Sequence, residues 1–97
     1  MATYIALADW TDQGVKGFKD SVDRYETNQG QLQAMGVEVK AIYWTLGAHD
    51  MVSIIEAPDE QTLAAALLTA AGPGNIRTTT LRAFNADEMR GVISKAR

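Results

Sequence analysis

The sequence contains a single histidine, His49, and Asp50 follows it directly in the stretch TLGAHDMV. A His-Asp pair suggests catalysis, a metal site or a pH switch, and the unperturbed histidine pKa of about 6.5 suits proton transfer near neutrality. We therefore take His49 and Asp50 as candidate catalytic residues, with His49 as a general base. Two alternatives stay open: Asp50 accepts backbone N–H bonds in a turn, and His49 is a surface residue without a role.

Metal binding has weak support in the sequence. One histidine and no cysteine leave only carboxylates as further ligands, which does not suit a typical zinc site. Residues 9 to 20, DWTDQGVKGFKD, match a calcium loop poorly, because Thr11 and Gln13 stand at its third and fifth positions. Asp20 also replaces the bidentate glutamate at the twelfth position. We predict no metal ion and no cofactor.

Length and composition limit the classes of function. The 97 residues are predicted to form one domain, residues 1–97. The formal charge of −3 lacks the basic excess that phosphate backbones require, so we expect no nucleic-acid partner. No apolar run approaches the roughly 20 residues of a membrane helix, and the start MATYIALADW does not resemble a signal peptide. We expect a cytoplasmic protein without a membrane partner.

Hydrophobic periodicity predicts four strands and three helices in the order β-α-β-β-α-β-α. The strands are expected at residues 3–9, 37–46, 51–57 and 75–84. Helical spacing begins at Val15 and predicts one long amphipathic helix that ends near Gly36. A second helix follows Pro58 and stops at Gly72. Asn85 is the expected cap of a last, short helix.

This order is typical of the α+β ferredoxin-like fold, a β-α-β-β-α-β subunit that here carries a C-terminal helix. Right-handed crossovers place the first and third strands in the centre of an antiparallel four-stranded sheet. Both faces of these central strands are apolar, whereas two main helices cover only one face. A soluble monomer rarely exposes a contiguous apolar face, so we expect a second copy to pack sheet against sheet.

Two stretches, TLGAHDMVSIIEAPDEQTLAAALL and GNIRTTTLRAF, resemble the GYD-domain family of the dimeric α/β-barrel superfamily. Gly47 and Asp50 match the Gly-x-Tyr-Asp signature, but His49 stands where the family usually has tyrosine. The resemblance implies a homodimer, or a higher oligomer, in which two sheets pair into a barrel. It implies no settled activity. Haem is used by larger chlorite-converting relatives in the superfamily, and we do not expect it here.

Relatives in the superfamily keep their small-molecule pocket between the long helix and the sheet, and we expect Tyr25, Gln29 and His49 to reach such a pocket if this protein has one. The candidate ligand-binding residues are Tyr25, Gln29, Tyr43 and Trp44. Gln29 interrupts the apolar stripe of the helix, while Tyr43 and Trp44 alternate on a strand and so face opposite sides of the sheet. We predict a protein that binds or transforms a small organic molecule. The alternative is a non-catalytic dimeric module with a regulatory or scaffolding role.

Overall fold

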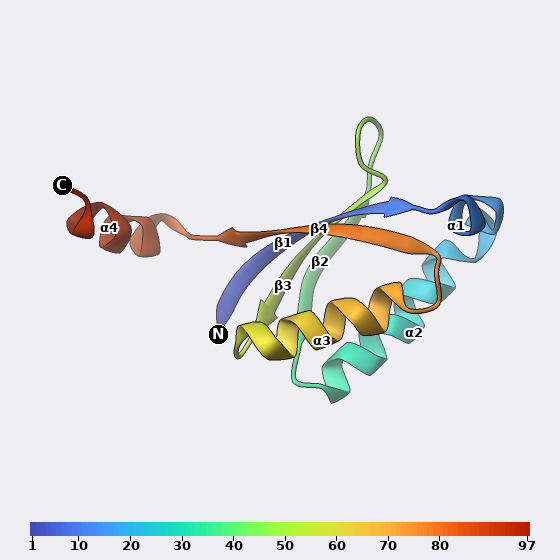
Figure 1. The fold of residues 1–97 in the computed structure, drawn as a ribbon, viewed down its shortest axis with the longest axis horizontal. Helices are drawn as coiled ribbons and strands as arrows, with labels where there is room; N and C mark the ends of the chain where they lie inside the picture. Colours follow the sequence, from blue (N-terminus) through green and yellow to red (C-terminus); the bar gives the residue numbers. More distant parts are fainter.

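A computed structural model describes residues 1–97 and shows one four-stranded antiparallel sheet in the order β2-β3-β1-β4 (Figure 1). The elements, in chain order, are β1 (Ala2–Trp10), α1 (Asp12–Lys16), the 3₁₀ turn η1 (Phe18–Asp20), α2 (Ser21–Ala34), β2 (Glu38–Trp44), β3 (Met51–Ala57), α3 (Glu60–Ala71), β4 (Ile76–Ala83) and α4 (Ala86–Lys95). The first and third strands are central, as predicted. The subunit is therefore an α+β ferredoxin-like fold with an added C-terminal helix.

The two main helices, α2 and α3, lie side by side on one face of the sheet (Figure 1). The hydrophobic core fills the layer between this face and the helices. Its buried residues are Tyr4, Ala6, Leu32, Val37, Ile55, Ala57, Leu63 and Ala66. Alternate residues of β1, from Tyr4 to Ala8, are buried, as the period-two geometry of a strand requires.

The prediction of one long helix from Val15 is wrong in one respect. The helix is interrupted at Gly17, before α2 begins. Two glycines lie within four residues here, and glycine is a poor helix former. The Arg24 guanidinium donates hydrogen bonds to the carbonyl oxygens of Gly17, at 2.8 Å, and Gly14, at 3.2 Å. The Gly17 carbonyl also accepts a 3.0 Å bond from the Asp20 N–H in the 3₁₀ turn η1, so the α-helical ladder does not run on from α1 into α2. The break shifts the start of the covering helix to Ser21.

The start of α3 confirms the predicted helix boundary and gives a pH-dependent prediction. Asp59 is the N-cap, and its Oδ1 accepts a hydrogen bond of 2.7 Å from the Thr62 backbone N–H. That bond is the main reason why the pKa of Asp59 lies below its ordinary value of 3.8. A lowered folded-state pKa means that the capping contribution is complete above the unfolded pKa and is lost as the pH falls through the folded one.

We therefore expect Asp59→Ala to lower the free energy of unfolding at neutral pH. In acid, the free energies of unfolding of the variant and the wild type should differ less. Urea denaturation of both proteins at pH 7 and at about pH 3 would measure the two differences. Asp59→Asn is the control, because its amide oxygen can accept the same N–H bond without titrating. An equal gap between wild type and Asp59→Ala at both pH values would contradict this assignment.

The sheet face opposite α2 and α3 is apolar and carries no covering helix; we call it the outer sheet face. In the strand register, Ile5 pairs with Ile54 on one side and with Leu81 on the other, while Leu7 pairs with Val52. The apolar side chains therefore form one row across three strands, Ile54–Ile5–Leu81, and a shorter row beside it, Val52–Leu7, which ends at Thr79 on β4. Ile54 and Leu81 are 38% and 48% exposed. A face of this kind marks an interaction surface in a soluble protein.

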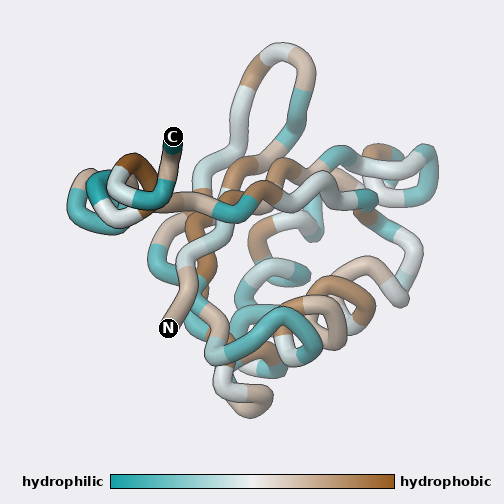
Figure 2. The backbone as a smooth tube through the Cα atoms, turned by 60° about the vertical axis from the view of Figure 1, so that its left-hand side comes forward, coloured by the Kyte–Doolittle hydropathy of each residue, from teal (hydrophilic) through white to brown (hydrophobic).

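The last helix, α4, stands clear of the sheet at the far end of β4 (Figure 1). Asn85 caps it, as predicted, in a reciprocal arrangement with Glu88 known as a capping box. Figure 2 shows hydrophobic residues in α4 as well as in the central strands. Ile93 of α4 is 60% exposed. A ten-residue helix is marginal in water unless its apolar side packs against something. None of the helices combines the length and apolar character that a membrane span requires.

Candidate functional site

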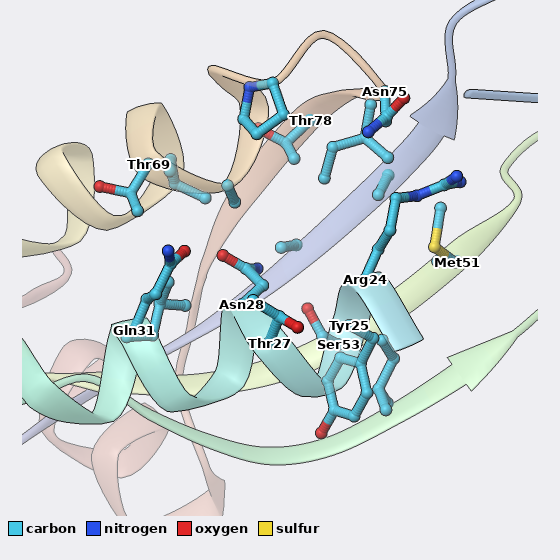
Figure 3. A pocket seen from close by; sticks show the side chains of 18 of the residues that line it. Arg24, Tyr25, Thr27, Asn28, Gln31, Met51, Ser53, Thr69, Asn75 and Thr78 are labelled. Atoms are coloured by element: carbon cyan, nitrogen blue, oxygen red, sulfur yellow. The ribbon is translucent and has the colours of Figure 1, made fainter. Parts of the chain in front are cut away.

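A cavity of about 430 Å³ lies between α2, α3 and the helix-facing side of the sheet (Figure 3). It exists because the sheet residues at its base are small. Ala6 and Ala8 on β1 and Ser53 on β3 are neighbours in the strand register, and their side chains leave space beneath α2. The volume is within the range of small-molecule sites, near its lower end.

Hydroxyl and amide groups share the cavity wall with apolar side chains. The polar uncharged lining residues are Ser21, Thr27, Asn28, Gln31, Ser53, Thr69, Asn75 and Thr78. The larger apolar ones are Leu32, Ile42, Met51, Ile55, Leu67 and Ile76. Such a mixture, a mostly apolar wall with a few polar groups that fix orientation, is typical of sites for small organic molecules.

Two charged residues, Asp23 and Arg24, also line the cavity. Asp23 is exposed, and the Arg24 guanidinium is bonded to the two glycine carbonyls described above. The lining therefore offers hydroxyl and amide groups for hydrogen bonding, with its one guanidinium already used to hold the turn before α2. No group of three histidine or carboxylate side chains gathers in a geometry that would hold a metal ion.

The predicted ligand-binding residues occupy different places. Tyr25 lines the cavity, and the Trp44 ring packs edge-on against it with ring centroids 5.9 Å apart. Trp44 Nε1 also donates a 2.9 Å hydrogen bond to Ser21 Oγ, so Trp44 supports two lining residues without lining the cavity itself. Tyr43 is exposed, and neither it nor Gln29 is part of the lining.

The lining residues of α2 follow a helical spacing that starts at Ser21. Ser21, Tyr25, Asn28 and Leu32 recur at intervals of three and four, and they all line the cavity. Gln29 belongs to a different face of this helix. Helical spacing counted from Ser21, and not from Val15, therefore predicts that Asn28 lies on the same face as the other lining residues.

His49 and Asp50 lie in the β2–β3 connection, which projects from the sheet (Figure 1), and neither residue lines the cavity. Asp50 Oδ2 accepts a 2.9 Å hydrogen bond from the Trp10 backbone N–H, which is the kind of structural role considered for it above. The His49 ring instead meets Asp9, with Nδ1 at 3.2 Å from each carboxylate oxygen. Sequence reasoning missed Asp9, which the pairing of Ala8 with Met51 brings to this end of the sheet.

We expect His49→Phe to change the free energy of unfolding by less than about 1 kcal/mol, because the His49–Asp9 pair is half-exposed. Binding of any ligand in the cavity should be unchanged, since His49 lies outside its lining. Chemical denaturation and a ligand titration of the variant measure the two quantities. A clear loss of ligand affinity would contradict this placement and would support the predicted role of His49 at the site.

The fold and the cavity define a ferredoxin-like α+β protein with a helix–sheet pocket. The family model described as GYD domain matches residues 4–93, so the chain belongs to the GYD domain family. It is 39% identical over 85 residues to the Thermus thermophilus protein named glutamine synthetase and cystathionine beta-lyase binding protein. The alignment covers 87% of this chain and 90% of that protein.

A solved structure gives independent support for the fold. The crystal structure of TTHA0845 from Thermus thermophilus superposes with a TM-score of 0.57 at 20% sequence identity. The match covers 89% of this chain and 96% of that chain. At this identity the likeness concerns the fold alone, and it agrees with the ferredoxin-like architecture predicted from the order of strands and helices.

Proposed function

We propose that this protein is a homodimeric binding protein with a regulatory role, which acts by docking on another protein. One observation carries the proposal. The chain matches, over nearly its whole length, a relative that is named as a binding protein of glutamine synthetase and cystathionine beta-lyase. An uncovered apolar face and a projecting helix in a small chain fit a protein that works through protein contacts. The cytoplasm is its proposed compartment.

Direct binding to the two enzymes tests this proposal. The purified protein is titrated onto immobilised glutamine synthetase and, separately, onto immobilised cystathionine beta-lyase, with bovine serum albumin as the control surface. Saturable binding to one enzyme at micromolar concentration is the expected result. Binding to neither enzyme, or equal binding to albumin, would contradict the proposal for these partners.

The apolar outer sheet face supports one part of the proposal, the homodimer. Two apolar sheet faces pack about 10 Å apart when their side chains interdigitate. A two-fold axis would place the Ile5, Ile54 and Leu81 row of one copy against the same surface of its partner. Such pairing gives the dimeric α/β barrel expected from the sequence, and a second copy would also offer a surface to α4.

A second function, binding of a small organic molecule, is favoured by the cavity beneath α2. Of the residues predicted to bind it, Tyr25 is the one that lines this cavity. Apart from the exposed Asp23 and the Arg24 that holds the turn before α2, the polar groups of the lining are hydroxyls and amides, and it contains no histidine, lysine or glutamate. We therefore favour binding over transformation of the molecule. A catalytic role for His49 and Asp50 stays a prediction, which unchanged turnover of the His49→Phe variant in any assay that shows activity would contradict.

A further inference from the structure

We infer that the cavity beneath α2 selects an uncharged organic molecule that carries a hydroxyl or amide donor on an apolar body. This inference rests on the proposed binding of a small molecule and names the chemical class of that molecule. Three features of the cavity carry the inference. They are the charges of its lining residues, one buried oxygen without a partner, and the apolar residues that surround the remaining space.

The charged residues of the lining favour an uncharged ligand. Arg24 donates two of its five N–H groups to the Gly14 and Gly17 carbonyls, which hold its guanidinium at the turn before α2. Asp23 is exposed to water and does not provide a buried counter-charge for a cation. The lining holds one carboxylate, Asp23, and one guanidinium, Arg24, so it has no net charge that would offset the lost hydration of an anion or a cation.

The ligand's donor is expected to meet Asn28. The Oδ1 atom of Asn28 is buried and has no hydrogen-bond partner within the protein. The side chain extends from α2 into the cavity (Figure 3), and its amide turns about its last bond at little cost. An O–H or N–H group of a ligand would supply the missing bond and remove the penalty of an unpaired buried carbonyl.

Three other polar groups of the wall are already engaged. Ser21 Oγ accepts from Trp44, Thr69 Oγ1 donates to the Ala65 carbonyl oxygen at 2.9 Å, and Asn75 Oδ1 accepts from Gln13 at 3.0 Å. Among the polar lining residues, Asn28 has a buried oxygen without a partner, so we take it as the acceptor on which selection depends.

The remaining wall is suited to a compact hydrocarbon body. Leu32 on α2 and Ile55 on β3 are buried core residues in the cavity wall, and Leu67 and Ile76 line it from α3 and β4. The volume of about 430 Å³ accommodates a ring with one or two substituents. A phenol or a cyclic amide has the required combination of size, donor and neutrality.

Three ring compounds of similar size separate these requirements: phenol, toluene and benzoate. Phenol carries a neutral donor, toluene has none, and benzoate is an anion at neutral pH. Each is titrated into the ¹⁵N-labelled full-length protein, and the amide shifts report both the affinity and the place of binding. We expect phenol to shift the cavity amides, including those of Asn28, Ser53 and Thr78, and to bind about fivefold more tightly than the other two compounds.

The outcomes distinguish the ligand class from the existence of the site. Benzoate or toluene binding in the cavity as tightly as phenol would overturn the inference and leave small-molecule binding intact. Saturable shifts confined to other surfaces, or no shifts with any compound, would overturn the cavity as a small-molecule site and the inference with it. Because these comparisons use the wild type, they do not depend on whether any variant folds.

A substitution of the acceptor tests the role of Asn28 directly. Asn28→Leu should lower the affinity for phenol to that for toluene, about fivefold, and leave toluene binding unchanged. Gln33→Leu is the matched control, since Gln33 is an exposed residue of the same helix outside the cavity lining. Unchanged selectivity for phenol in a folded Asn28→Leu variant would overturn the assignment of Asn28.

Discussion

Leu81→Lys is expected to convert the proposed homodimer into monomers that remain folded. Leu81 lies at one end of the apolar row on the outer sheet face and is 48% exposed in the single chain. Lysine is therefore tolerated in the monomer, but in the dimer its charge is enclosed between two apolar sheets. Each uncompensated buried charge costs about 3 kcal/mol or more, and a two-fold dimer contains two of them. The dimer dissociation constant should rise more than about 100-fold.

Sedimentation velocity over a range of protein concentrations measures this shift. Leu68→Lys is the matched control: it makes the same change at a residue of α3 that is 74% exposed and lies away from the outer sheet face. The control should dimerise like the wild type. If folded Leu81→Lys associates as tightly as Leu68→Lys, the outer sheet face is not the dimer interface.

Gly14→Ala is expected to destabilise the protein by about 3 kcal/mol, the upper end of the usual cost of overpacking. An alanine Cβ at this buried position would lie 1.9 Å from the backbone oxygen of Asn75. That backbone cannot move freely, because the same oxygen accepts a 3.0 Å hydrogen bond from the Thr11 N–H. Asn75 lines the cavity, so a shift of this segment should also weaken ligand binding there.

Gly30→Ala is the control for Gly14→Ala, because it makes the same change inside α2 where a Cβ would meet no atom within 4 Å. Alanine is the better helix former, and this variant should be more stable than the wild type by about 0.5–1 kcal/mol. Urea denaturation of the two variants measures both values. Equal stability of the two variants would show that Gly14 does not hold the close contact with Asn75.

The arrangement of strands and helices was predictable because it depends on local patterns. The apolar runs of β1 and β3 indicated central strands, while Pro58 and the expected cap Asn85 marked two helix starts. The break before α2 was not predictable from the same patterns. Apolar residues continue at helical spacing through Gly17, and the turn is held by Arg24, whose bonds to Gly14 and Gly17 form only in the folded chain.

The candidate site was predictable only in part, because most of it depends on strand register and helix rotation. Tyr25 was identified by its type and its place on the helix, whereas Gln29 was chosen in place of its neighbour Asn28, which lines the cavity. The contact of His49 with Asp9 joins residues 40 positions apart and follows from the pairing of β1 with β3. The cavity itself arises from small side chains, which give no conspicuous signal in a sequence.

Native mass spectrometry of the freshly purified protein tests the central claim, self-association, most directly. The predicted spectrum at micromolar concentration is dominated by a species with twice the chain mass of 10.5 kDa, or by a larger assembly built from such dimers. Any retained neutral molecule would add its mass to the same species. A spectrum that shows only the single chain, under conditions that preserve a known dimer of similar size, would contradict the account.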